Sequence, residues 1–214
     1  LESHQKAAHA TESKYFDREI LPVEGKNAEG INNLVMADEG IRFDASLDKL
    51  AGLNPVTEGG VITAGNASQI TDGAAAVMVC NDAGLKKIKA SPRAEIVSIS
   101  VVGDDPVFML TGPIPASFKA LESANLSIED MDLYEVNEAF APVPLAWAAD
   151  LKADRSKLNV NGGAMALGHP LGATGAKLMT TLLHEMERRE STYGLQAICE
   201  GGGTANATII KRIS

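Results

Sequence analysis

The sequence lacks the features that mark several common classes of protein. No stretch approaches the roughly 18 uninterrupted apolar residues of a transmembrane helix, so we expect no membrane span. The formal net charge is −9 and the lysines and arginines do not cluster, which disfavours nucleic-acid binding. The only cysteines, Cys80 and Cys199, lie far apart, which excludes a disulfide framework or a metal-binding pattern and fits a reducing, cytoplasmic compartment.

The start of the chain lacks both a signal-peptide pattern and an initiator methionine. The chain begins with Leu1, inside a stretch whose apolar spacing is that of an amphipathic helix. We therefore expect it to be a piece of a longer protein. Its 214 residues are enough for one large domain, or for one domain and part of a second.

Strands and helices alternate in the hydrophobic pattern after residue 94. The sequence predicts four strands in this part, over residues 95–102, 133–136, 193–199 and 205–211. It also predicts three helices, over residues 115–124, 139–151 and 172–190. Such alternation is typical of an α/β fold, in which helices cover the faces of a sheet.

The part before residue 94 is more polar and is often broken by glycine, asparagine and proline. We predict a helix over 1–16, an extended segment over 19–23, and short helices over 46–51 and 81–87. Residues 71–76 are small and apolar and predict a buried helix, and Val77–Cys80 predicts a buried strand that would make Cys80 inert. Residues 25–66 have few apolar runs and are expected to lie over another domain. Ala90–Arg93 is the best linker candidate.

The most informative stretch is a glycine-rich run over residues 159–177 with a single histidine, His169, in its middle. Glycine offers no side chain to a core, so such a run indicates tight turns or a close approach to another group. Gly168 and Pro170 flank the histidine and restrict the direction in which it leaves the loop. A lone histidine is often a surface or satisfied core residue, but this setting favours a general base or an oxyanion donor.

Cys199 and Asn137 are further candidates, and each also has a plain structural explanation. Cys199 ends an apolar strand and precedes Glu200 and three glycines. It is either a small buried hydrophobe or a thiol that acts as nucleophile or as acid and base. Asn137 stands where a predicted strand meets a helix, so it is either a helix N-cap or a polar group of a site.

Other possible motifs are incomplete. The run that ends at Lys177 lacks the Gly-Lys-Ser/Thr ending of a phosphate loop. Ser68 has no Gly-x-Ser-x-Gly elbow around it, which disfavours a serine hydrolase. His4, His9 and His184 have no partners at metal-ligand spacing, so we predict no metal site.

Four groups of segments together resemble the thiolase family. They are Thr63–Ser68 with Asp72–Ala76, Asn137–Phe140, Gly162–Ala164 through Gly168-His169-Pro170, and Cys199–Gly203. They follow the order of the family and are spread over most of the chain. The Cys-Glu-Gly-Gly-Gly form looks most like actinobacterial thiolases that degrade fatty acids or sterol side chains.

The resemblance implies catalytic roles for four matching residues. His169 would line an oxyanion hole for a thioester carbonyl and help to activate the nucleophile, and Asn137 would hold a water that completes this hole. Cys199 would be the acid and base that moves a proton at the substrate α-carbon or at the CoA thiol. The backbone N–H of Gly201 would serve a second oxyanion hole.

The resemblance also implies how substrate is bound. Ser68 would touch the pantetheine arm of CoA, and Phe140 would help to wall the pocket. CoA and acyl-CoA would be substrates, and no permanently bound cofactor is expected. The family also suggests a homo-oligomer, either a dimer or a tetramer.

The implied architecture is a thiolase fold with a mixed sheet layered with helices. Residues 1–68 would be the remainder of the loop domain that covers CoA, 69–92 the end of the N-terminal domain, and 93–214 a complete C-terminal domain. Most of the N-terminal domain would be missing. Its acyl-accepting cysteine would be missing too, because neither Cys80 nor Cys199 occupies that position. That half would then come from a clipped part of the same chain or from a separate chain.

The expected function is that of part of a thiolase, an acyltransferase that moves acyl groups between a cysteine and CoA. It would cleave 3-ketoacyl-CoA by thiolysis or condense acetyl-CoA, and this chain alone would be inactive. One alternative is a non-catalytic subunit that binds CoA or lipid or acts as a scaffold, although such a subunit does not need Asn137, His169 and Cys199 together. Another is a decarboxylative condensing enzyme of the wider superfamily, which typically uses two histidines, or His and Asn, where this chain has His169 and Cys199.

Overall fold

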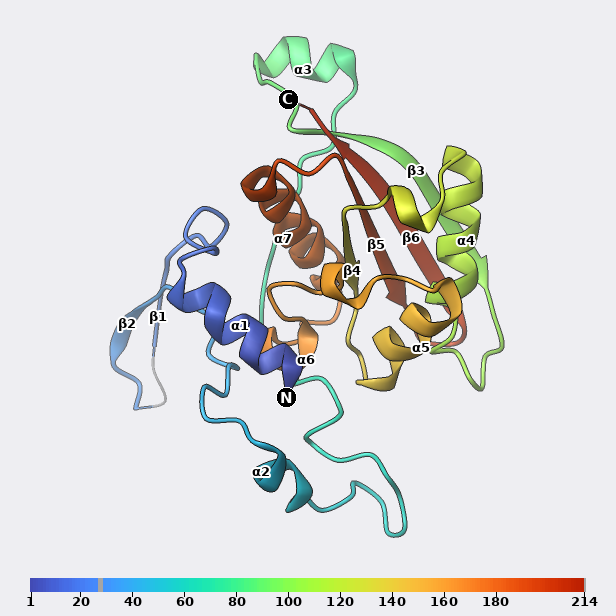
Figure 1. Cartoon of the computed structure of the whole chain (residues 1–214). Coiled ribbons are helices and arrows are strands. Elements are labelled where there is room, and N and C mark those ends of the chain that lie inside the picture. Colours follow the sequence, from blue (N-terminus) through green and yellow to red (C-terminus); the bar gives the residue numbers. More distant parts are fainter. Residues whose placement is uncertain (27–28, 214) are drawn as a thin grey trace.

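A four-stranded sheet organises the second half of the chain in the computed structural model, which describes residues 1–26 and 29–213 (Figure 1). The strand order is β3-β6-β5-β4. The strands are β3 (Ala94–Gly103), β4 (Leu133–Val136), β5 (Tyr193–Cys199) and β6 (Thr204–Arg212). Strand β6 runs antiparallel to β3 and β5, whereas β5 runs parallel to β4. The predicted α/β fold with a mixed sheet is therefore confirmed.

Helices cover both faces of this sheet. They are α4 (Pro113–Ala124), α5 (Pro142–Leu151) and α7 (Thr174–Arg189). Tyr134 and Val136 pack into the large core shared with α4 and α5, whereas Leu133 packs against α7. Because alternate side chains of a strand point to opposite faces, α7 lies on the other face from α4 and α5, as Figure 1 shows.

Sequence signals set the ends of these helices. Pro113 and Pro142 each occupy the beginning of a helix, where the N–H that proline lacks would have no intrahelical partner. Asn125 ends α4 in a left-handed backbone conformation, and its N–H bonds to the last turn. The structure agrees with the predicted strands and helices of this half, although α5 begins at Pro142 rather than at residue 139.

The described first part of the chain lies around this layered unit and adds no strand to its sheet (Figure 1). It contains α1 (Glu2–Glu12), the antiparallel pair β1 (Val23–Lys26) and β2 (Asn32–Val35), α2 (Leu47–Ala51) and α3 (Asp82–Ile88). Helix α1 buries Ala7 and Ala10 in a cluster with Ala166 and Leu167 of α6 (Ala164–Leu167). The sequence did not predict β2 or α6, and the predicted helix over 1–16 ends at Glu12.

Two predicted elements are wrong. Residues 71–76 form no helix and residues 77–80 form no strand. Val77, Met78 and Val79 are 42%, 76% and 70% exposed. A strand needs a neighbour to bond its backbone, and no described strand pairs with this segment, so its apolar pattern is left without a core to join. Cys80 is consequently half-buried, not an inert core residue.

The described residues hold neither a membrane-spanning helix nor a metal-binding cluster. Within residues 1–26 and 29–213, no helix is long and apolar enough to cross a membrane. The same residues contain no group of three or more His, Cys, Asp or Glu side chains that could hold a metal ion.

Candidate active site

The parallel pairing of β4 and β5 brings two of the candidate residues to one edge of the sheet. Parallel strands end at the same edge, so the residue that follows β4 and the last residue of β5 lie near each other. Asn137 follows β4 and donates its backbone N–H to the carbonyl of Ala197 on β5, at 3.0 Å. Cys199 is the last residue of β5, two positions beyond Ala197. Asn137 and Cys199 therefore share this edge.

The glycine-rich loop delivers His169 to the same place. The side-chain amide of Asn137 lies 3.4 Å from Nε2 of His169. The backbone N–H of His169 is shared between the carbonyl of Gln69, at 3.1 Å, and Oγ1 of Thr71, at 3.0 Å. Two segments that are distant in sequence, residues 69–71 and the end of β4, thus fix the position of the histidine. Asn137 is not the N-cap of α5, which begins at Pro142 with Ala141 as its cap.

Close backbone approach explains the glycines on both sides of this loop. Gly168 has φ +83° and ψ 162°, a region that only glycine adopts readily. A Cβ added there would lie 2.1 Å from Oγ1 of Thr71. A Cβ on Gly163 would lie 2.4 Å from the carboxyl carbon of Glu138. The interpretation of these glycines as sites of close approach is confirmed, and the groups that approach them belong to the protein itself.

Thr174, at the start of α7, sets the tautomer of His169. Its hydroxyl donates to the carbonyl of Pro170 at 2.9 Å, which uses its only hydrogen. The contact of 2.6 Å between Thr174 Oγ1 and His169 Nδ1 must therefore be donated by the imidazole. A neutral His169 then carries its hydrogen on Nδ1 and a lone pair on Nε2, the atom that faces Asn137. That arrangement suits a general base.

Burial acts on the two titratable candidates in opposite directions. Desolvation lowers the pKa of the half-buried His169, so the neutral imidazole is favoured. Desolvation raises the pKa of the Cys199 thiol, which is 8% exposed, and the nearby charge of Glu200 adds to this effect. At neutral pH the site thus holds a neutral base and a protonated thiol.

The glycines after Cys199 form an open turn. Gly201 is exposed, and nothing lies within 4 Å of where its Cβ would stand. Gly202 and Gly203 both have positive φ, and a Cβ on Gly203 would lie 2.5 Å from the carbonyl oxygen of Asp104. This turn therefore has room for a ligand to approach Gly201, while Gly203 is held against the rest of the protein.

The two residues expected to bind CoA lie side by side next to Asn137. The backbone N–H of Ser68 donates to the carbonyl of Ala139 at 3.0 Å, and a bridge joins Ala67 to Phe140. Both Ser68 and Phe140 are half-buried. The first part of the chain therefore meets the second part beside the candidate site.

Comparison with known proteins identifies the family. The model of the thiolase C-terminal domain matches residues 90–212, and the model of the thiolase N-terminal domain matches residues 1–83. The chain belongs to the thiolase family. Among its relatives is the steroid 3-ketoacyl-CoA thiolase FadA6 of Mycobacterium tuberculosis, 54% identical over 100% of this chain and 51% of that protein. The resemblance to actinobacterial thiolases is thus confirmed.

Other relatives and solved thiolase structures agree. An acetyl-CoA acetyltransferase of Synechocystis is 45% identical over 99% of this chain and 53% of that protein. The Bacillus anthracis acetyl-CoA acetyltransferase structure matches with a TM-score of 0.94 and 43% identity over 100% of this chain and 54% of that one. The structure of human mitochondrial 3-ketoacyl-CoA thiolase in complex with CoA matches with a TM-score of 0.89 and 40% identity. This match covers 99% of this chain and 52% of that one. This thiolase chain spans about half the length of these proteins.

Two residues of this thiolase chain support the site and a third lies buried beside it, and the sequence patterns singled out none of them. Thr174 orients His169, as described above. Glu138 accepts hydrogen bonds from Oγ of Ser3, at 2.7 Å, and from the N–H of Met165, at 3.0 Å, and so ties α1 and α6 to the end of β4. Glu135 lies fully buried within β4. Of these three residues, only Glu135 stands out in the sequence, because a carboxylate is rarely found inside an otherwise apolar strand.

Proposed function

We propose that this chain supplies the acid–base half of a thiolase active site, with acyl-CoA and CoA as substrates. The observation that carries the proposal is the contact of Asn137 with His169 Nε2 at the sheet edge where Cys199 ends β5. The nucleophilic cysteine belongs to a part of the enzyme outside this chain. Under this proposal, residues 1–68 cover CoA, 69–92 end the N-terminal domain, and 93–214 form the C-terminal domain.

In the first half-reaction, the lone pair on Nε2 of His169 accepts the proton of the nucleophilic thiol. The thiolate attacks the keto carbon of a 3-ketoacyl-CoA, and the bond between the α-carbon and the keto carbon then breaks. The acyl group stays on the cysteine as a thioester, and an acetyl-CoA enolate leaves. Cys199 donates its proton to the α-carbon of this enolate, which yields acetyl-CoA.

In the second half-reaction, the Cys199 thiolate takes the proton of an incoming CoA thiol. The CoA thiolate attacks the acyl-enzyme thioester, the bond to the cysteine breaks, and acyl-CoA is released. The imidazolium of His169 returns its proton to the cysteine. Each group ends in its starting state, and the same steps in reverse condense acetyl-CoA with an acyl group.

Charge develops on a thioester oxygen during both half-reactions. His169, once protonated, can donate from Nε2, and a water held by Asn137 completes this first oxyanion hole. The N–H of Gly201 serves the second hole, in the open turn described above. Removal of one donor from such a hole typically lowers the rate by about 10² to 10³.

Substrate binding and assembly complete the proposal. Ser68 and Phe140, which lie together beside Asn137, contact the pantetheine arm of CoA and wall the pocket. A relative whose structure was solved in complex with CoA supports CoA as the ligand. We further propose that the complete enzyme is a cytoplasmic homo-oligomer.

Replacement of Cys199 tests the proposal in the full-length polypeptide. Cys199→Ser keeps the size of the side chain but replaces the thiol by a hydroxyl that is a far weaker acid. We expect kcat for thiolysis of acetoacetyl-CoA to fall by about 10² or more, with little change in the Kd for CoA, because a positioned acid–base contributes about 10² to 10⁴.

Cys80→Ser is the matched control. Cys80 is half-buried before α3, away from the edge of β4 and β5, and its replacement should leave kcat near the wild-type value. A Cys199→Ser enzyme whose kcat stays within a few-fold of wild type would show that Cys199 is not the acid–base. A wild-type enzyme that binds CoA but performs neither thiolysis nor condensation would instead support the non-catalytic subunit.

A further inference from the structure

Glu135 is a buried carboxyl for which the proposed reaction provides no role. It lies in the middle of β4, is 2% exposed, and faces α7, as does Leu133 on the same side of the strand. Its Oε2 atom has no hydrogen-bonding partner among the described residues. Burial of a polar group without a hydrogen-bonding partner lowers the stability of the fold, so we expect a partner such as a buried water.

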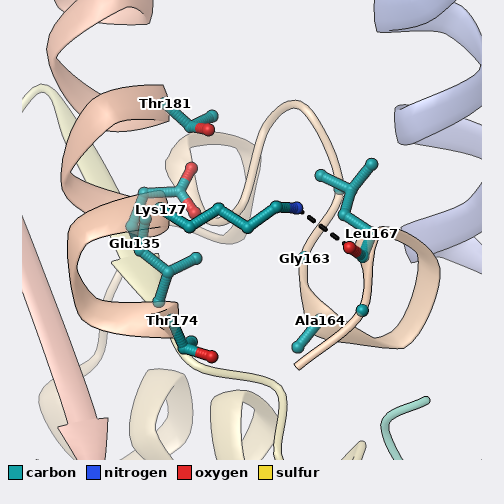
Figure 2. A pocket seen from close by; sticks show the side chains of 10 residues that line it. Glu135, Gly163, Ala164, Leu167, Thr174, Lys177 and Thr181 are labelled. Carbon is teal, nitrogen blue, oxygen red and sulfur yellow. Dashed lines mark hydrogen bonds between the residues drawn. The ribbon is translucent and has the colours of Figure 1, made fainter. Parts of the chain in front are cut away.

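A small cavity lies directly beside this carboxyl. Glu135 lines it together with the glycines of the His169 loop and the residues of α7 that face the sheet (Figure 2). Its volume is about 10 Å³, which is the space that one water molecule requires. Lys177 also lines the cavity, but its ammonium group is directed to the carbonyl of Leu167, at 2.9 Å, as Figure 2 shows, and to the carboxylate of Asp38, at 3.4 Å.

The two hydroxyls in the cavity wall can only accept further hydrogen bonds. Thr174 donates its hydrogen to the carbonyl of Pro170, and Thr181 donates its hydrogen to Oε1 of Glu19, at 3.0 Å. A water in the cavity can therefore donate to both threonines, and it then needs a donor for its own oxygen. A neutral carboxylic acid at Glu135 provides that donor, whereas a carboxylate cannot.

The surrounding charges favour the neutral acid. Burial is the largest cause that raises the pKa of Glu135 well above its ordinary value. The carboxyls of Glu138, Glu19 and Glu185 raise this pKa further, and the charge of Lys6 has a smaller, lowering effect. Hydrogen bonding in the cavity and the surrounding charges thus both favour a protonated Glu135.

We propose that Glu135 is a positioning residue of this thiolase site, a neutral acid that donates to one buried water and through it to Thr174. The water gives Thr174 a second donor opposite the Nδ1–H of His169. The Thr174 hydroxyl is thereby held in the one orientation that keeps the hydrogen of His169 on Nδ1 and its lone pair on Nε2. The catalytic part of this inference rests on the proposed function, whereas the state of Glu135 and its link to His169 do not.

Three variants distinguish this role from simple packing. Glu135→Gln keeps the shape and supplies an N–H donor to the water. Glu135→Leu has a similar volume but no donor. Gln196→Leu is the matched control, because Gln196 is opposite Glu135 on β5, is buried, and also has an unpartnered oxygen, but does not line the cavity.

Infrared and NMR spectra of the 214-residue chain test the proposal without an assay of activity. Burial raises the pKa of Glu19 to about 7, so this carboxyl also contributes a band at pH 7. We therefore expect the band of protonated Glu135 in the difference between the spectra of wild type and Glu135→Gln, and no such difference between wild type and Gln196→Leu. We also expect the pKa of the His169 ring to rise in Glu135→Leu and to keep its wild-type value in Glu135→Gln and Gln196→Leu. Absence of that band, or an unchanged His169 pKa in Glu135→Leu, would overturn the proposal. If Glu135→Leu does not fold, the comparison of wild type with Glu135→Gln still decides the protonation state.

Kinetics of the full-length polypeptide test the catalytic part. We expect kcat of Glu135→Leu to fall about tenfold or more, with KM nearly unchanged. The acid limb of its pH profile should move to higher pH. In Glu135→Gln, kcat and the position of the acid limb should both return to their wild-type values. Equal kcat in wild type and Glu135→Leu would refute the positioning role. A wild-type enzyme without thiolysis would refute the proposed function, and the spectra above would still decide the state of Glu135.

Discussion

At the scale of single residues, the chemistry of the site depends on side chains that no simple motif contains. His169 is held by Thr174, five positions further along the chain, and the hydroxyl of Thr174 donates a hydrogen bond to the carbonyl of Pro170. That threonine has no spare hydrogen, so the imidazole must be the donor at Nδ1. The identity of the base atom, Nε2, is thus decided by a neighbour of the histidine.

Replacement of this threonine should separate orientation from folding. Thr174→Val removes the hydroxyl with almost no change of shape and leaves the Nδ1–H of His169 without an acceptor. We expect kcat of the full-length polypeptide to fall about tenfold or more, because a mispositioned general base loses much of its contribution of about 10² to 10⁴. Thr174→Ser should restore most of the activity, and steady-state kinetics would measure both effects.

Thr180→Val is the control for this prediction. Thr180 lies on the same helix and also donates its hydroxyl to a carbonyl one turn earlier, that of Ala176, at 2.8 Å. We expect it to change stability about as much as Thr174→Val while kcat stays near wild type. Equal losses of kcat in the two valine variants would contradict the role of Thr174.

The pH dependence follows from the same residue. Burial lowers the pKa of His169, and the base must be neutral to accept a proton. The kcat of the full-length polypeptide should therefore stay constant as the pH falls to the ordinary pKa of histidine, about 6.5, and should decline only below that pH.

At the scale of elements, glycines shape the loop that carries His169. Gly168 combines a backbone conformation that other residues avoid with contact to Thr71 from the first part of the chain. Gly172, four residues later, also has positive φ, at +87°, but no atom lies within 4 Å of where its Cβ would stand. The two positions thus differ chiefly in the space around them.

This pair gives a matched test of close approach. Gly168→Ala should lower the free energy of unfolding by about 2 to 4 kcal/mol. The new Cβ would strain the backbone at this φ and ψ and would also clash with the side chain of Thr71. Gly172→Ala should cost only about 1 kcal/mol, the usual price of positive φ for a residue with a Cβ. Urea unfolding of the 214-residue chain would measure both values, and equal losses would show that crowding at Thr71 is unimportant.

At the scale of the whole molecule, the chain leaves apolar groups uncovered. Val77, Met78 and Val79 are exposed in the extended segment before α3, and Ile99 and Val101 are 60% and 59% exposed on the edge strand β3. Apolar residues concentrated in this way are typical of surfaces that contact another protein part. They accord with a chain that spans about half the length of its relatives.

The proposed function, with its nucleophilic cysteine outside this chain, predicts that the 214-residue chain has no thiolase activity alone. It holds the proposed base and acid but no cysteine at the position of the acyl acceptor, so no acyl-enzyme can form. Purified chain mixed with acetoacetyl-CoA and CoA should show no loss of acetoacetyl-CoA above the uncatalysed rate. Turnover above that background, abolished by His169→Ala, would contradict this prediction and place the nucleophile within the chain.

The sequence by itself determined the strands and helices of the second half, because their apolar residues repeat with the period of the element. Proline also marks the beginnings of α4 and α5. It also identified His169, Asn137 and Cys199 as candidates, because glycine-rich loops and strand ends are unusual settings for such side chains. The pattern failed at residues 71–80, where an apolar segment has no partner strand in the described structure.

Only the tertiary structure decided how these residues meet. The parallel pairing of β4 with β5 places Asn137 and Cys199 at one edge, and the loop held by Gln69 and Thr71 brings His169 to Asn137. Burial among several segments also lowers the pKa of His169 and raises that of Glu135. Such contacts join residues far apart in the chain, so local sequence patterns do not encode them.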